Sequence, residues 1–226
     1  MSHVAAREAI IETALDASRL GLNLGASGNV SQRVNGGFLI TPTGLTYDDL
    51  APADIVFMTD EGDTPPTTDG TVQRLPSSEW RFHLDIYRAR EDVAAIVHTH
   101  SLLATALSCL HRDIPDFHYM VAVAGGADIR CAPYATFGTE VLSENAVAAL
   151  DGRTACLLAN HGQIATGNDL NAALGLAQQV EALAAQYLNC LQVGEPQLLG
   201  ADEMARVLEK FKTYGQQSGG QEGEGA

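Results

Sequence analysis

The sequence predicts a single α/β domain in which a mixed or antiparallel sheet is flanked by helices. Apolar side chains recur at helical spacing in residues 4–20 and in the Ala- and Leu-rich segment 169–192. Short apolar runs that end in turns lie between the helical segments, at 37–44, 92–100 and 154–162. These runs are too short and irregular for a regular array of parallel βαβ units, which favours a mixed or antiparallel sheet.

Local patterns predict the remaining elements and the extent of the domain. The segment 77–91 begins with two serines and a glutamate, which indicates a helix start with Ser78 as the expected N-cap. We expect further helices over 101–110, 138–150 and 200–215, and short strands within 23–37, 54–60 and 127–134. Residues 60–76 are expected to form an exposed loop. The domain is expected to span 1–215, followed by a flexible tail over 216–226.

The composition argues against several classes of partner. The 226 residues are 46% apolar and carry a formal charge of −15, from 28 acids against 13 bases, without a cluster of Lys and Arg. Nucleic-acid binders and proteins that dock on anionic lipid need a basic face, so neither partner is expected. No apolar run is long enough to span a membrane, and the first residues carry acids where a signal peptide has its apolar core.

The cysteines favour a reducing compartment. Cys109, Cys131, Cys156 and Cys190 are widely spaced and form no CxxC pair. Their apolar neighbourhoods predict buried free thiols. We therefore expect a cytoplasmic protein.

Two histidines with one residue between them end the apolar run of residues 92–100. Side chains two apart in a strand share a face, so His98 and His100 would project together. Such a pair can bind one Zn²⁺ ion, but two strand-end histidines that merely lie close remain the alternative. His161 follows another apolar run at a glycine turn. A third ligand from a second strand end is what a catalytic zinc site needs.

Glu79 lies at the start of the predicted helix, directly after Ser77 and Ser78. It is either an acid stabilised by the helix dipole or a carboxylate near the metal, acting as ligand or as general acid and base. Hydroxyls and free N–H groups at a helix N-terminus also make a phosphate site. The segments GASGNVS and TPTG supply further glycine-rich backbone of this kind. The sequence has neither GxGxxG nor a Walker A lysine, so a nucleotide is not indicated.

The four other histidines fit a metal site less well. His3 lies near the start of the chain, and His83 lies on the predicted helix, where a structural role is expected. His111 sits in a charged turn, and His118 is expected to be packed or hydrogen-bonded.

Nine segments, taken together, resemble the class II aldolase/adducin family. They are SRLGLNLGASGNVS, LITPTGLTYDDL, LPSSEWRFH, VHTH, IPDFHYMVAVAGG, CAPYATFGTEVLSENA, NHGQIA, VEALAAQYL and VLEKFKTYG. They follow one another in the family's order from about residue 18 to 215. The set is specific although no single segment is, and it implies the fold of that family.

The resemblance implies a zinc-dependent aldolase and assigns residues to it. The metal ligands would be His98, His100 and His161, with Glu79 as a further ligand and as the acid/base. Zn²⁺ is the expected metal, one per subunit, and Mn²⁺ or Co²⁺ are the alternatives. The residues expected to hold the phosphate of the substrate are Asn29, Thr43, Gly44, Ser77 and Ser78.

The same resemblance implies a homotetramer with active sites between subunits. Tyr119 would reach a neighbouring site to protonate the leaving aldehyde, and Tyr214 would help to cover the site. The implied reaction is the reversible cleavage of a ketose 1-phosphate to dihydroxyacetone phosphate and an aldehyde. The candidate substrates are L-fuculose 1-phosphate, 5-deoxyribulose 1-phosphate and 5-methylthioribulose 1-phosphate, because the motifs describe the phosphate half of the molecule and not the aldehyde half.

Other members of the family are alternatives. Ribulose-phosphate 4-epimerases use the same ligands without releasing products, methylthioribulose-phosphate dehydratases eliminate water, and adducin-like relatives are non-catalytic interaction modules. The segments HYM and CAPYATFGT resemble the aldolases, and the presence of every ligand argues against a non-catalytic module. One position departs from the aldolase pattern, because Ala26 replaces a threonine of the phosphate loop and removes a hydroxyl donor.

Overall fold

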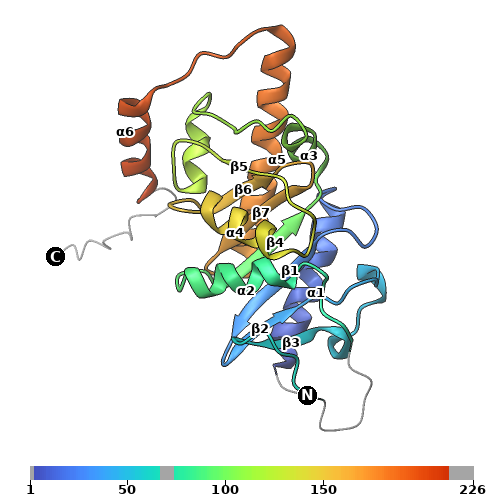
Figure 1. The fold of residues 1–226 in the computed structure, drawn as a ribbon. Coiled ribbons are helices and arrows are strands. Elements are labelled where there is room, and N and C mark those ends of the chain that lie inside the picture. Colours follow the sequence, from blue (N-terminus) through green and yellow to red (C-terminus); the bar gives the residue numbers. More distant parts are fainter. Residues whose placement is uncertain (1–2, 67–73, 214–226) are drawn as a thin grey trace, which may run out of the picture.

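The computed structural model describes residues 3–66 and 74–213, in which seven strands form one sheet (Figure 1). The strand order is β3-β2-β1-β4-β7-β6-β5, and every neighbouring pair is antiparallel except β5 and β6. The strands are β1 Asn29–Val34, β2 Gly37–Ile40, β3 Val56–Thr59, β4 Ala95–Thr99, β5 Cys131–Ala132, β6 Ala155–Leu158 and β7 Gly162–Gly167. The predicted α/β domain with a mixed sheet is confirmed.

Helices cover both faces of this sheet. The α-helices are α1 Val4–Arg19, α2 Trp80–Ala89, α3 Leu102–Ser108, α4 Glu140–Ala149, α5 Leu170–Val193 and α6 Ala201–Phe211. The 3-10 helices are η1 Tyr47–Asp49, η2 Pro52–Asp54 and η3 Tyr119–Ala124. One buried cluster joins α1, α3 and α5 to the sheet, and a second joins α2 and α4 to its other face. Helix α6 packs on η3, apart from the sheet (Figure 1).

Strand β4 lies in the middle of the sheet and sends alternate side chains into the two cores. Ala95 and Val97 pack in the cluster beneath α1 and α5, whereas Ile96 packs in the cluster beneath α2 and α4. His98 therefore shares the face of Ile96, because residues two apart in a strand point the same way. The end of β4 is thus directed at the start of α2.

Two local expectations about secondary structure were wrong. Strand β7 was not predicted, because its sequence GQIATG consists mostly of small residues and has a glycine at each end. Pairing with both β4 and β6 stabilises it as a strand. Ser78 is not the N-cap of α2. That position is taken by Glu79, whose side chain makes no capping hydrogen bond and faces the histidines instead.

The cysteines also differ from expectation. Only Cys156 is buried, while Cys131 and Cys190 are partly exposed and Cys109 is exposed. All four are free thiols. Cys109 follows the end of α3, where the apolar sequence turns toward solvent. The expected tail 216–226 and residues 67–73 of the expected loop lie outside the described residues.

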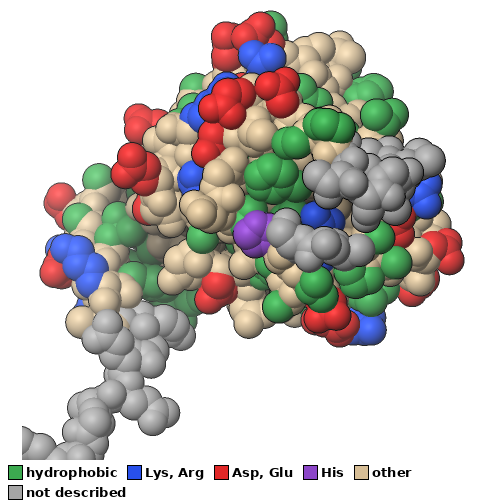
Figure 2. Space-filling model, turned by 90° about the horizontal axis from the view of Figure 1, so that it is seen from below, with side chains coloured by type: hydrophobic (Ala, Val, Ile, Leu, Met, Phe, Trp, Pro, Cys, Tyr) green, Lys and Arg blue, Asp and Glu red, His purple; other side chains and the backbone are tan. Residues whose placement is uncertain are grey.

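The surface agrees with the charge pattern of the sequence. On the face shown in Figure 2, acidic and basic side chains are interspersed, and Lys and Arg do not gather into a basic patch. Among residues 3–66 and 74–213, no helix combines the length and the apolar character required to cross a membrane.

Arg33 of β1 ties the end of α2 to the sheet. Its Nε donates to the carbonyl of Val93 at 2.9 Å, and its Nη2 donates to the carbonyls of Tyr87 at 2.7 Å and Arg90 at 2.9 Å. Carbonyls at a helix C-terminus lack partners within the helix, so one guanidinium satisfies several of them. The guanidinium also lies over the Tyr87 ring, 4.7 Å from its centroid.

We predict that Arg33→Lys lowers the free energy of unfolding by roughly 2 kcal/mol, because an ammonium cannot replace a planar fork of donors. Urea unfolding measures this loss. The matched control is Arg19→Lys, whose side chain is 60% exposed, and its unfolding midpoint should match that of the unsubstituted protein. Equal midpoints for all three proteins would contradict this role of Arg33.

Candidate metal centre

Four side chains from three separate segments converge at one end of the sheet. Glu79 precedes α2, His98 and His100 lie at the end of β4, and His161 lies in the turn between β6 and β7. Their ligand atoms all lie within 4.8 Å of one another. Glu79 Oε2 lies 3.2 Å from His98 Nε2, and Glu79 Oε1 lies 3.0 Å from His161 Nε2. The structure therefore brings together all four predicted ligands.

A backbone contact orients the buried ring of His98. Its Nδ1 lies 2.8 Å from the carbonyl oxygen of Gln163, to which it donates a hydrogen bond. In a neutral imidazole this leaves the lone pair on Nε2, which lies 3.0 Å from His100 Nε2. Such a backbone contact on the outer nitrogen is usual for histidines that ligate metals.

The turn that carries His161 requires a glycine after it. A Cβ on Gly162 would lie 2.4 Å from the Thr99 carbonyl oxygen and 3.0 Å from His100 Cδ2. The chain passes so close to the end of β4 that only glycine fits. Asn160, just before His161, adopts a φ of 54°, which reverses the chain between β6 and β7.

The loop before β1 packs on the same strand end. Asn23 Oδ1 accepts a hydrogen bond from the His100 backbone N–H at 3.0 Å. Gly28 has a φ of 77°, and a Cβ there would lie 2.6 Å from the His98 carbonyl oxygen. This contact places the predicted phosphate loop beside the two histidines.

The protonation states suit a divalent cation. Burial opposes ionisation of Glu79, but the protonated forms of His98 and then of His161 outweigh it and hold the pKa of the carboxyl well below its ordinary value. Burial, together with His98 and His161, lowers the pKa of His100 to about 4. At neutral pH, Glu79 is ionised and His100 is uncharged, which are the forms that bind metal ions.

The unpaired atoms of the site also fit a cation. Within the described residues, Glu79 Oε1 is buried and accepts no well-aligned hydrogen bond, although His161 Nε2 lies nearby. A bound cation would supply the positive charge beside Glu79 that ring protons of His98 and His161 supply in its absence. Imidazole nitrogens with a carboxylate oxygen are a donor set typical of Zn²⁺. Glu79 and the three histidines would hold such an ion.

Asn29 and Ser77 fix the outer side of Glu79. Asn29 Nδ2 donates to Glu79 Oε2 and to Ser77 Oγ, both at 3.0 Å, and the Glu79 backbone N–H donates to Ser77 Oγ at 3.3 Å. Asn29 is 2% and Ser77 is 6% exposed, so water does not compete for these bonds. A substrate phosphate would reach Asn29 by replacing one of its two acceptors.

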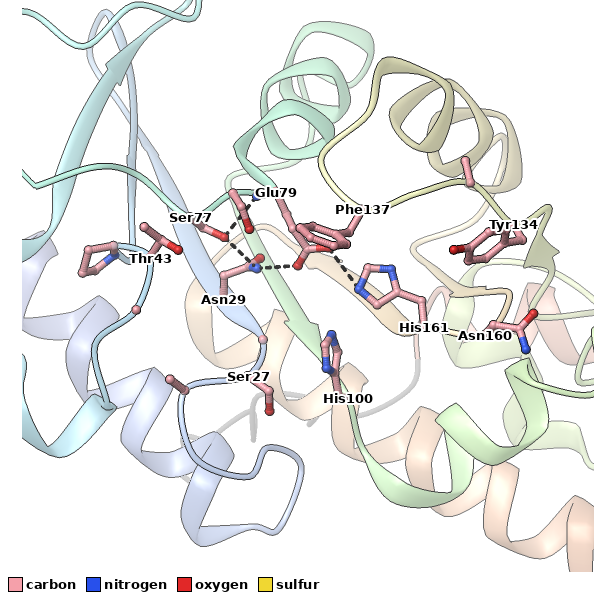
Figure 3. A pocket seen from close by; sticks show the side chains of 16 residues that line it. Ser27, Asn29, Thr43, Ser77, Glu79, His100, Tyr134, Phe137, Asn160 and His161 are labelled. Carbon is pink, nitrogen blue, oxygen red and sulfur yellow. Dashed lines mark hydrogen bonds and ion pairs between the residues drawn. The ribbon is translucent and has the colours of Figure 1, made fainter.

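A cavity of about 330 Å³ opens onto this cluster (Figure 3). All five residues expected to hold phosphate line it, together with Glu79, His100 and His161. The five residues are Asn29, Thr43, Gly44, Ser77 and Ser78. The fold therefore gathers donors from β1, from the turn after β2 and from the segment before α2. Ala26 also lines the cavity and adds no side-chain donor there.

The far side of the cavity contains residues that sequence reasoning missed. Tyr134, Phe137 and Asn160 line it; in the view of Figure 3, Tyr134 and Asn160 lie beyond His161, whereas Phe137 lies between Glu79 and His161. Tyr134 is 58% and Phe137 is 65% exposed, so their rings border its opening. The segment CAPYATFGT supported the resemblance, but nothing in its residue pattern indicated that its two rings would border the metal site.

One predicted residue is not part of this cavity as the single chain forms it. Tyr119 is 47% exposed and lines a separate cavity of about 620 Å³ beside α6, with Val207 and Phe211. Tyr214 lies outside the described residues. Two other histidines lie outside the cavity. His118 Nδ1 accepts a hydrogen bond from the Met120 N–H, and His83 is fully buried.

Comparison with known proteins agrees with this geometry. Residues 8–188 match the family model "Class II Aldolase and Adducin N-terminal domain". The 5-methylthioribulose-1-phosphate/5-deoxyribulose-1-phosphate aldolase of Rhodospirillum rubrum is 58% identical over 214 residues, 95% of this chain and 94% of that protein. The L-fuculose phosphate aldolase of Escherichia coli is 52% identical over 207 residues, 91% of this chain and 94% of that protein.

The fold is likewise shared with a solved structure. An L-fuculose 1-phosphate aldolase matches with a TM-score of 0.88 and 39% sequence identity, covering 94% of this chain and 98% of that one. The agreement extends over almost the whole chain, including the segments that carry the four ligands. The chain is a member of the class II aldolase and adducin family.

Proposed function

We propose that this chain is a divalent-metal-dependent aldolase that cleaves a ketose 1-phosphate reversibly to dihydroxyacetone phosphate and an aldehyde. The observation that carries the proposal is that one cavity is lined both by the carboxylate and imidazoles of the metal cluster and by a set of neutral hydrogen-bond donors. The named activities of the relatives from R. rubrum and E. coli support it.

The residues divide the reaction between them. Backbone and hydroxyl donors of Thr43, Gly44 and Ser78 would hold the phosphate and so position the neighbouring carbons. A bound divalent cation, for which Zn²⁺ is our choice, would act as a Lewis acid on the substrate oxygens. The bond between C3 and C4 breaks, the C4 hydroxyl loses its proton, and C3 gains one. Glu79 would take up a proton from solvent and deliver it to C3, because it is the carboxylate that borders the cavity.

The substrate class follows from the two sides of the cavity. The three candidate ketoses, L-fuculose, 5-deoxyribulose and 5-methylthioribulose 1-phosphates, share a terminal carbon without a hydroxyl group. The exposed rings of Tyr134 and Phe137 would offer that end an apolar surface at the opening of the cavity. We infer that these three compounds are substrates of one class for this site.

A coupled assay tests the activity. The metal-loaded protein is mixed with each of the three ketose 1-phosphates, and a dehydrogenase specific for dihydroxyacetone phosphate reports its release. We expect release from at least one compound and none after chelation. Conversion of substrate without dihydroxyacetone phosphate would indicate an epimerase or a dehydratase and would overturn the aldolase proposal.

The metal ligands are tested by substitution. We predict that His98→Ala weakens Zn²⁺ binding by more than about 100-fold, because loss of an outer partner alone costs 10- to 100-fold. Competition with a coloured chelator measures the affinity, and the loss of aldolase activity should accompany it. His3→Ala is the control, since His3 stacks on Phe57 away from the cluster. An unchanged affinity in His98→Ala would exclude His98 as a ligand.

We further propose that Tyr119 exchanges the proton of the C4 hydroxyl in the site of a neighbouring subunit of a homotetramer. In its own chain the residue is exposed and lines a different cavity, so a partner site is the one it could serve. The C4 hydroxyl would pass its proton to the phenol oxygen of Tyr119 while the phenol releases its own proton to solvent, and the phenol would then donate a hydrogen bond to the aldehyde oxygen.

Subunit mixing tests this arrangement. We predict that Tyr119→Phe and His98→Ala proteins are each inactive, and that exchanging their subunits restores part of the activity, since some hybrid sites combine an intact His98 with an intact Tyr119. The coupled assay before and after mixing measures the recovery. A hybrid that forms, as shown by mass spectrometry, but stays inactive would contradict a role across subunits.

A further inference from the structure

A chain of buried polar side chains runs from α2 to the metal centre. Tyr87 Oη lies 2.8 Å from Ser31 Oγ, which lies 2.6 Å from His83 Nδ1. His83 Nε2 lies 2.5 Å from Asn29 Oδ1, and Asn29 Nδ2 lies 3.0 Å from Glu79 Oε2. The chain thus connects a tyrosine of the core with the carboxylate at the cavity.

The contacts of Asn29 set the direction of every bond in this chain. Its Nδ2 lies 3.0 Å from Glu79 Oε2 and from Ser77 Oγ, which also accepts the Glu79 backbone N–H, so the NH₂ of Asn29 faces these acceptors and the carboxamide oxygen faces His83. His83 must then donate from Nε2, which leaves Nδ1 as an acceptor in the neutral ring. The Ser31 hydroxyl donates to Nδ1, and the Tyr87 hydroxyl donates to Ser31.

Burial prevents water from replacing any member of the chain. Ser31 and His83 are fully buried, Asn29 is 2% exposed and Tyr87 is 3% exposed. Burial, followed by the influence of His98, lowers the pKa of His83 to about 3, so the ring is neutral at physiological pH. Burial also raises the pKa of Tyr87 well above its ordinary value, so its hydroxyl keeps its proton.

The alternative orientation of Asn29 would be costly. Rotating the carboxamide would point its oxygen at Glu79 Oε2 and Ser77 Oγ and leave two acceptors facing each other. It would also aim an NH₂ group at the nitrogen of His83 that carries a proton. A buried polar group without a partner destabilises the folded state, because it has lost its hydrogen bonds to water and gained none in return. His83 is therefore the residue that distinguishes the oxygen of the Asn29 carboxamide from its NH₂ group, and it does so from the side of Asn29 that faces away from Glu79.

We propose that His83 is a positioning residue that holds Asn29 with its NH₂ facing Glu79 and Ser77. Glu79 is then held with Oε2 on Asn29 while Oε1 remains directed at His161. The expected effect on kcat rests on the proposed aldolase function, whereas the expected tautomer of His83 and the expected Zn²⁺ affinity do not. His83 acts through Asn29, since it does not line the cavity.

Two substitutions at one position separate positioning from packing. His83→Gln can present an amide N–H near the place of Nε2, whereas His83→Leu removes the donor and keeps an apolar side chain. We expect His83→Leu to lower kcat and Zn²⁺ affinity by about 10- to 100-fold, the range seen when partners that orient metal ligands are removed. KM should change less than kcat, and His83→Gln should regain most of the loss.

The matched control for destabilisation is Leu84→Ala in the same helix. Leu84 is 2% exposed and packs in the core beneath α2, outside the polar chain. We expect it to lower the melting temperature at least as far as His83→Leu does, because truncating a buried side chain leaves a cavity in the core. At a temperature where all the variants are folded, it should keep its kcat and its Zn²⁺ affinity.

The tautomer gives a readout that needs no activity. In protein labelled with ¹⁵N-histidine, NMR should show the proton of His83 on Nε2 and a bare Nδ1. A proton on Nδ1 would overturn the proposal, as would a folded His83→Leu protein with unchanged kcat and Zn²⁺ affinity, or a folded His83→Gln protein as impaired as His83→Leu. If the unsubstituted protein cleaves no ketose phosphate, the aldolase proposal fails, and the tautomer and metal affinity still decide the role of His83.

Discussion

The ionised carboxylate of Glu79, buried among imidazoles and one carboxamide, is the constraint on which the surrounding structure depends. A buried charge is costly unless it is paired and hydrogen-bonded, so every neighbouring segment supplies a partner. His98 comes from β4, His161 from the β6–β7 turn and Asn29 from β1. These segments meet because β1, β4 and β7 are neighbours in the sheet.

The site is assembled at the expense of local stability. Glu79 occupies the N-cap of α2 without capping it, and Gly28 and Gly162 keep the backbone close to β4 where any larger residue would collide. Asn23 Nδ2 and Gln163 Oε1 are buried without hydrogen-bond partners in the described part of the chain. Such local conflicts are expected where side chains are arranged for chemistry and not for folding.

The cavity would bind an anion without a basic side chain. No Lys or Arg is among the described residues that line it, and the whole chain carries a charge of −15. Backbone N–H groups, hydroxyls and the start of α2 would therefore hold the phosphate, with a metal cation as the compensating positive charge. Neutral donors in fixed positions give little long-range attraction but orient a bound phosphate precisely. Precise orientation is what a small substrate needs if one particular carbon–carbon bond is to lie beside the metal ion.

The sequence by itself predicted the α/β class, most helix positions, the four side chains that cluster at one end of the sheet and the five residues that line the cavity beside them, because strand alternation and glycine turns are local and the ordered motifs are specific. It missed β7, whose small residues become a strand only through pairing with both neighbours. It also treated His83 as structural. Only the tertiary structure decided that Tyr134 and Phe137 border the cavity, that Tyr119 lies outside it and that His83 meets Asn29. Those contacts join residues far apart in the chain, and no local pattern encodes them.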